Sequence, residues 1–218
     1  MAITKLISEE IPYVSPLETA KNALRIMDDN KLEHLPVVSE GMEYVGLVSE
    51  QQLLDVGANT LIESLTADRP SATLSNDIYS ILSIMSQFHY SILPIIDNSN
   101  KYLGCITRST LIDEMAEMTS AHTPGGVIEI ETDALNFSTA VISNVTEYNS
   151  MKVVSMLAQP QGAHGIKAVL KLNGQETTSV IQGLERNGYK IRNVHNGDSK
   201  YNDMLEEHYD ALIKYMEV

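Results

Sequence analysis

The chain has 218 residues, of which 43% are hydrophobic and 6% aromatic, so it is long enough for two or three domains whose cores are mainly aliphatic. Its formal net charge of −14, without a cluster of Lys or Arg, argues against binding to nucleic acid or to an anionic membrane surface. The single cysteine, Cys105, excludes an intramolecular disulfide, and there is neither a run of about eighteen apolar residues nor a secretion signal, so we expect a cytoplasmic protein.

One pattern occurs twice, with an offset of 58 residues. Residues 34–39 (HLPVVS) and 44–49 (YVGLVS) return as residues 92–97 (ILPIID) and 102–107 (YLGCIT), without insertion or deletion. A repeat that keeps its spacing across a whole unit indicates a duplicated fold. We therefore expect any functional site to lie between two similar halves.

The first copy predicts a helix followed by a hairpin. An extended segment at residues 11–14 precedes a stretch whose apolar residues recur at helical spacing. Two apolar strands, residues 35–38 and 44–48, follow and are joined by a turn that contains Gly41. The apolar positions of the helix are Ala20, Ala23, Leu24 and Met27.

A capping-box spacing follows the hairpin. Ser49 stands at an N-cap position with Gln52 three residues later, which predicts a short helix that extends through Val56. The second copy repeats every element, with Thr107 in the place of Ser49. We expect two β-α-β-β-α domains, residues 1–60 and 61–118.

A different domain is predicted after the repeat. Residues 119–125 are polar and contain Pro and Gly, which is typical of a linker. Residues 126–197 then predict a strand, a helix, two strands, a helix and a strand, the ferredoxin-like β-α-β-β-α-β order. Ile128 and Ile130 alternate with Glu129 and Glu131 in the first strand, and the last strand is predicted to begin at Tyr189. Gly188 is expected to end the second of these helices. The predicted fold class is α+β.

The last segment, residues 198–218, predicts an amphipathic helix with one apolar stripe. The helix packs either on its own domain or against a second copy of the chain, and the sequence leaves both alternatives open. The residues of the stripe are Leu205, Tyr209, Leu212, Ile213 and Met216.

Both copies resemble the cystathionine-β-synthase (CBS) domain. Pro36 lies in an apolar strand, Gly46 follows ten residues later, Ser49 three residues after that, and Met27 precedes Pro36 by nine residues. The second copy matches at the same spacing. Across residues 1–118 the pair therefore resembles a tandem CBS domain, or Bateman module.

The resemblance implies a regulatory ligand that contains adenosine, such as an adenine nucleotide or S-adenosylmethionine, in the cleft between the copies. Ser49 or Thr107 would offer a hydroxyl and a helix N-terminus to a phosphate, although each is equally a plain helix cap. The family places an acidic residue three positions later, where it binds the ribose hydroxyls. Here Gln52 and Thr110 stand at that position and offer only neutral hydrogen bonds.

Charge near the predicted cleft differs between the copies. Glu33, three residues before Pro36, adds a negative charge near a position where some family members carry a basic side chain, whereas its counterpart Ser91 is neutral. Arg108, next to Thr107, is the cation best placed in the sequence for a phosphate. The second copy is therefore the better candidate pocket.

Residues 125–196 resemble an ACT domain, an amino-acid-sensing module, mainly in the order of their elements. Members that bind amino acids carry an Asp-x-x-Gly turn after the first strand, and Asp133 and Asn136 stand at its ends here. Asn tolerates left-handed geometry but adds a side chain that Gly lacks. A ferredoxin-like domain without the ligand site still serves as a dimerisation sheet. The whole chain resembles the acetoin-utilisation-type CBS–ACT proteins.

The sequence carries no catalytic or metal-binding motif. The six His residues lack metal-ligand spacing, and neither a nucleophile elbow nor a phosphate-binding loop is present. We expect a non-enzymatic regulatory protein that binds a small effector and transmits the signal through a homodimer. The alternative is an interaction protein that has lost ligand binding and serves dimerisation or docking of a protein partner.

Overall fold

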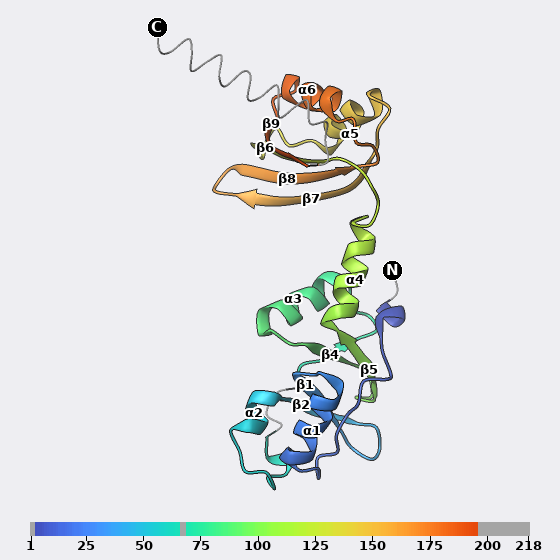
Figure 1. Ribbon diagram of the computed structural model, residues 1–218, viewed down its shortest axis with the longest axis vertical. Helices are drawn as coiled ribbons and strands as arrows, with labels where there is room; N and C mark the ends of the chain where they lie inside the picture. The colour runs from blue at the N-terminus through green and yellow to red at the C-terminus, as the bar shows by residue number, and fades with distance from the viewer. Residues whose placement is uncertain (1–2, 66–68, 196–218) are drawn as a thin grey trace. The chain divides into compact units, whose positions relative to one another are not determined.

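Figure 1 shows the computed structural model, which describes residues 3–65 and 69–195. The chain forms two compact units, Met1–Glu114 and Met115–Val218, and helix α4 (Arg108–Met118) crosses from one to the other. The first copy of the repeat and the second copy as far as Glu114 belong to the first unit. The amphipathic helix predicted at residues 198–218 lies outside the described residues, and the domain boundaries expected from the sequence stay predictions.

The first repeat forms the predicted elements in the predicted order. They are a 3-10 turn (Ile3–Leu6), α1 (Ala20–Asn30), β1 (His34–Val38), β2 (Tyr44–Ser49) and α2 (Glu50–Leu54). Thr19 starts α1 because its hydroxyl accepts a hydrogen bond from the Asn22 N–H (3.4 Å). Helix α2 is shorter than predicted: it ends before Val56, where a turn closed by the Thr60 N–H and the Gly57 carbonyl takes over.

The second repeat has the same order. Its elements are a 3-10 turn (Ile62–Ser64), β3 (Ala72–Thr73), α3 (Ile78–Phe88), β4 (Ile92–Ile96), β5 (Tyr102–Thr107) and α4. Asp77 caps α3 by accepting hydrogen bonds from the N–H groups of Tyr79 (2.8 Å) and Ser80 (3.1 Å). Strand β3 pairs parallel to β4, as Val14 pairs parallel to Val37 in the first repeat.

The 58-residue offset extends to the backbone conformation. Helices α1 and α3 are followed by left-handed residues, Lys31 (φ 55°) and His89 (φ 56°), and both hairpin turns contain another, Met42 (φ 60°) and Asn100 (φ 62°). Left-handed residues other than glycine are uncommon. The two copies therefore have the same backbone conformation at these turns as well as the same hydrophobic pattern.

The two repeats join through their hairpins. The Tyr44 N–H donates to the Asn100 carbonyl (3.0 Å), and the equivalent Tyr102 N–H donates to the Met42 carbonyl (2.8 Å). Buried side chains from both hairpins form an apolar cluster at this joint, which removes their surface from water. The buried members are Val38, Tyr44, Leu47, Ile92, Tyr102 and Cys105.

A close backbone approach explains one glycine of the repeated motif. Ser8 and Cys105 exchange two backbone hydrogen bonds (2.8 and 3.0 Å), so the N-terminal segment lies against β5. Gly104 has φ 136°, and a Cβ at this position would lie 2.6 Å from Ile7 Cγ2 and 2.7 Å from the Ser8 carbonyl oxygen. A larger residue does not fit there without a shift of this segment.

The second unit is a four-stranded sheet with two helices on one face (Figure 1). The strand order β7-β8-β6-β9 and the β-α-β-β-α-β sequence make the split arrangement that was expected. Every neighbouring pair is antiparallel. The elements are β6 (Val127–Asp133), α5 (Thr139–Tyr148), β7 (Val153–Gln161), β8 (Gly165–Leu172), α6 (Thr178–Arg186) and β9 (Lys190–His195).

The core of the second unit follows the predicted alternation. Ile128 and Ile130 are buried under the helices, while Glu129 faces the other side and forms an ion pair with Lys167 (2.8 Å). Gly188 has φ 85° just after α6, which confirms it as the residue that ends this helix. One expectation was wrong: Tyr189, predicted in the last strand, lies before β9 and is buried in the core.

Candidate functional site

A groove lies between the two repeats and includes the start of α4. Its volume is about 410 Å³, and both repeats contribute to its walls. We call it the Thr107 groove. The lining residues are Ile11, Asn30, Lys31, Leu32, Glu33, Ser91, Ile92, Thr107, Arg108 and Ser109.

Thr107 ends β5 and caps α4. Its hydroxyl accepts a hydrogen bond from the Thr110 N–H (3.0 Å), while the Arg108 N–H donates to the Ser91 carbonyl (2.9 Å). Two N–H groups of the first turn are therefore already bonded within the protein, which reduces what the helix N-terminus offers to an anion. The side chains of Arg108 and Ser109 remain as polar groups in the groove wall.

Arg108 connects the second repeat to the first. Its Nη2 donates to the His89 carbonyl (3.0 Å) and lies 3.7 Å from Glu33 Oε2. The side chains of both charged residues are about half exposed, 49% for Arg108 and 61% for Glu33. The guanidinium thus stands at a solvent-accessible rim, where a ligand can reach it.

The two residues at the predicted ribose positions lie outside the groove wall. The Thr110 hydroxyl is 2.9 Å from the Thr107 hydroxyl, and Thr110 does not line the groove. In the first repeat the predicted capping box is present: Gln52 Oε1 accepts from the Ser49 N–H (2.9 Å), and the Gln52 N–H donates to the Ser49 hydroxyl (3.2 Å). The amide oxygen of Gln52 is therefore used by the helix cap.

A second cavity, the aromatic cavity, was not identified from the sequence. It has a volume of about 390 Å³ and is lined by Arg69, Pro70, Ser71, Ile84, Phe88 and Tyr90. Three of its residues are the equivalents, 58 positions later, of residues in the Thr107 groove: Arg69 of Ile11, Phe88 of Asn30 and Tyr90 of Leu32. The repeat in the sequence was therefore the signal that could have predicted a second cavity.

Aromatic rings occupy the region next to this cavity. Phe88 and Tyr90 stack with ring centroids 5.7 Å apart, and His34 meets Tyr90 edge-on at 5.6 Å. Neither Ser49 nor Gln52 lines the cavity. The structure thus brings Thr107 and Arg108 to the wall of the Thr107 groove, whereas Ser49 and Gln52 lie outside the walls of both cavities.

The candidate loop of the second unit is exposed. Asp133 ends β6, and its carbonyl accepts the Asn136 N–H (3.0 Å). Asn136 does not adopt a left-handed conformation. The buried Tyr189 braces the loop, because its hydroxyl accepts from the Ser138 N–H (3.1 Å) and lies 3.4 Å from the Asn136 carbonyl oxygen.

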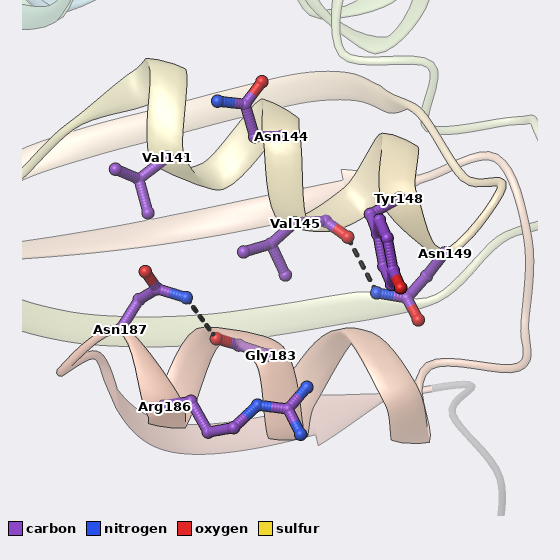
Figure 2. A pocket seen from close by; sticks show the side chains of 8 residues that line it. All are labelled: Val141, Asn144, Val145, Tyr148, Asn149, Gly183, Arg186 and Asn187. Carbon is purple, nitrogen blue, oxygen red and sulfur yellow. Dashed lines mark hydrogen bonds between the residues drawn. The ribbon is translucent and has the colours of Figure 1, made fainter.

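Figure 2 shows a further groove, between α5 and α6, with a volume of about 360 Å³. The two helices pack closely because Gly183 faces Val145. Asn149 and Asn187 end the two helices in the same way, each donating its side-chain amide to a carbonyl four residues earlier (2.8 Å). Arg186 is the charged residue of the wall.

Residues 3–65 and 69–195 give little support for a metal site, a membrane-spanning helix or a cysteine nucleophile. No group of three or more His, Cys, Asp or Glu is placed to hold a metal ion, and no helix is both long and apolar enough to cross a membrane. Cys105 is buried, and burial raises the pKa of its thiol to about 12. It is therefore a core residue and not a nucleophile.

The duplicated unit, with a groove between its copies, defines a paired-repeat module. The CBS domain model matches residues 3–59 and 62–117. Because these matches cover more than half of the chain, the protein belongs to the CBS-domain family, and the prediction of a tandem CBS pair is confirmed.

Curated relatives are longer than this chain. It is 28% identical to homoserine O-acetyltransferase of Methanocorpusculum labreanum over 114 residues, which is 51% of this chain and 23% of that enzyme. It is 31% identical to inosine-5'-monophosphate dehydrogenase of Nitrosopumilus maritimus over 100 residues, 45% of this chain and 21% of that enzyme. The chain thus spans less than a quarter of either protein.

Among solved structures, a CBS domain pair/ACT domain protein from Thermotoga maritima is similar. The TM-score is 0.50 at 17% identity, and the match covers 54% of this chain and 98% of the other. At this identity the likeness shows the fold alone.

Proposed function

We propose that this chain is a non-enzymatic, cytoplasmic sensor that binds an adenosine-containing ligand in the Thr107 groove. The observation that carries the proposal is the wall of that groove, where Thr107 and Arg108 of the second repeat meet Leu32 and Glu33 of the first. The CBS resemblance supports adenosine as the ligand class. The apolar side chain of Leu32 suits the base, the hydroxyl of Thr107 suits the sugar, and the guanidinium of Arg108 suits a polar substituent.

A ligand in this groove contacts both repeats at once. It therefore stabilises the relative arrangement of the repeats that binds it best, and its effect equals the difference in affinity between the arrangements. Several polar links join the two repeats, among them the contact between Arg108 and Glu33. A ligand at the groove is well placed to change that link.

For the second unit we propose an ACT-like domain, residues 126–197, that dimerises and passes the change to a second copy or to a protein partner. The β7-β8-β6-β9 order supports this assignment. The exposed Asp133–Asn136 loop, without glycine, supports dimerisation more than amino-acid binding. Acetoin-utilisation-type proteins are the relatives that we propose.

The rival function is an interaction protein that has lost ligand binding. One observation favours it: both ribose positions carry neutral residues that are already hydrogen-bonded within the protein. Gln52 is part of the cap of α2, and the Thr110 hydroxyl is hydrogen-bonded to the Thr107 hydroxyl. In that case both units serve dimerisation or partner docking only.

A thermal-shift screen with AMP, ADP, ATP, S-adenosylmethionine, NAD and the amino acids separates the two functions. A ligand at a hundred times its dissociation constant adds about 2.7 kcal/mol to the free energy of unfolding. The absence of any shift at millimolar concentration contradicts the sensor function for these compounds.

The double variant Thr107→Ala/Arg108→Ala locates the ligand. We expect it to abolish the shift, measured against its own unliganded melting temperature. The matched control is Ser49→Ala/Glu50→Ala, the same two positions 58 residues earlier, which also removes a helix cap and should keep the shift. The reverse result places the ligand in the first repeat.

A further inference from the structure

Three charged residues line the Thr107 groove: Lys31, Glu33 and Arg108. Lys31 is already paired, because its Nζ lies 2.9 Å from Asp28 Oδ1 and this hydrogen bond raises the pKa of the Lys31 ammonium group. Lys31 and Asp28 together carry no net charge, and Glu33 and Arg108 are the charged residues that face each other between the repeats.

Glu33 is held in place by its backbone. Its carbonyl accepts the Glu50 N–H (2.9 Å) at the start of α2, and His34, the next residue, begins β1. The backbone of Glu33 is therefore held beside the groove, and its exposed carboxylate moves by rotation of the side chain. In the structure Glu33 Oε2 lies 3.7 Å from Arg108 Nη2.

This arrangement has a consequence for phosphates. Arg108 is the guanidinium of the groove wall, so in the arrangement that the structure shows, a phosphate bound to Arg108 comes close to Glu33 as well. Like charges about 4 Å apart repel one another even in water, and the exposed ion pair with Arg108 offsets only part of that repulsion. The Glu33 carboxylate does not repel a neutral or cationic substituent.

We propose that Glu33 determines the charge selectivity of the Thr107 groove, so that an adenosine derivative with a neutral or cationic substituent binds in preference to a phosphorylated one. This inference rests on the proposed function, because it concerns the ligand of the same groove. Glu33 is a specificity-determining residue that acts by its negative charge beside Arg108.

Isothermal titration calorimetry of the full chain at low salt tests the inference with AMP, adenosine and S-adenosylmethionine. In Glu33→Gln we expect AMP to bind about three- to tenfold more tightly, because an amide replaces the charge without changing the shape. Adenosine should keep its affinity within about twofold, and the sulfonium compound should bind more weakly. The wild-type chain should bind adenosine at least as tightly as AMP.

Glu40→Gln is the matched control. Glu40 is exposed in the hairpin turn between β1 and β2 and does not line the groove, so the control changes the net charge equally. Equal gains for AMP in the two variants, or an equal gain for adenosine in Glu33→Gln, would overturn the role of Glu33. If the compounds bind and Glu33→Gln changes none of their affinities, the role of Glu33 is overturned, but the proposed function stands. If no variant binds any of the three compounds, the proposed function itself fails for this ligand class.

Discussion

His34 Nδ1 lies 2.9 Å from the hydroxyl of Ser91, although 57 residues separate the two in the chain. The same nitrogen accepts a longer hydrogen bond from the Ser91 N–H (3.4 Å), so its lone pair faces a donor. A second proton on Nδ1 would face that N–H directly. The neutral imidazole therefore fits this contact between the repeats better than the cation does.

The stability of the first unit should depend on pH through His34. Burial lowers the pKa of His34, as does Arg108, while Glu33 opposes the shift. A histidine with a lowered folded pKa contributes stability that is complete above its unfolded value of about 6.5 and is lost as the pH falls through the folded pKa. The free energy of unfolding should decrease from pH 7 to 5, by at most about 1.4 kcal/mol per pH unit.

Urea unfolding at several pH values measures this dependence, and His34→Gln should flatten it. Carboxylates such as Glu18 and Asp77 also have lowered pKa values, because hydrogen bonds favour their charged forms. Their contribution is lost only below about pH 4.5, outside this window. An unchanged slope in His34→Gln would assign the dependence to other groups.

Cys105 should be nearly inert to thiol reagents while the chain is folded. Burial raises the pKa of its thiol to about 12, so roughly one molecule in ten thousand carries a thiolate at pH 8. Labelling with a disulfide reagent should be about a thousandfold slower than in the denatured chain. Because the sequence has one cysteine, the absorbance change reports this residue alone. Rapid labelling of the folded chain would contradict its burial.

Gly183→Ala should destabilise the second unit. A Cβ at this position would lie 2.6 Å from Val145 Cγ1, and a β-branched side chain moves aside only with difficulty. Overpacking typically costs about 1–3 kcal/mol, against a gain of about 1 kcal/mol from the helix propensity of Ala. Urea unfolding should show a net loss.

The double variant Gly183→Ala/Val145→Ala controls for this explanation. Removing the two methyl groups of Val145 makes room for the new Cβ, so the loss should be smaller than the sum of the two single losses. Additive losses would show that the contact with Val145 is not the cause.

Thr110→Asp should raise the affinity for adenosine by about tenfold. The CBS resemblance implies that an acid at this position, next to the groove residue Ser109, binds the two ribose hydroxyls, and charge-assisted bonds are stronger than the neutral ones that Thr offers. An acid in the first turn of α4 also suits the helix dipole, so the unliganded chain should not lose stability. Calorimetry with adenosine measures the gain.

Gln52→Asp is the equivalent change in the first repeat. Because Gln52 lies in α2 of the first repeat and not in α4, whose first residues line the Thr107 groove, this variant should leave adenosine binding unchanged. Equal effects of the two substitutions would indicate a general effect of charge and not a restored ribose contact.

The elements that the sequence predicted correctly depend on local spacing. The helix caps at Ser49 and Thr107, the alternation of Ile128 and Ile130 and the final Gly188 all follow from residues within one or two turns. One error is local, because α2 ends at Leu54 before the turn between Gly57 and Thr60, and another involves distant parts of the chain. Tyr189 lies one residue before β9, and its buried hydroxyl accepts a hydrogen bond from the Ser138 N–H in the β6–α5 loop.

By itself, the sequence determined the duplication, the order of elements and the candidate residues Thr107 and Arg108, because a constant 58-residue offset and short periodic patterns are visible without coordinates. Only the tertiary structure decided which side chains meet across the repeats: Glu33 with Arg108, and His34 with Ser91. Such contacts depend on how the two hairpins pack together, and spacing along the chain carries no information about that packing. The groove and its charge are therefore properties of the pair and of neither repeat alone.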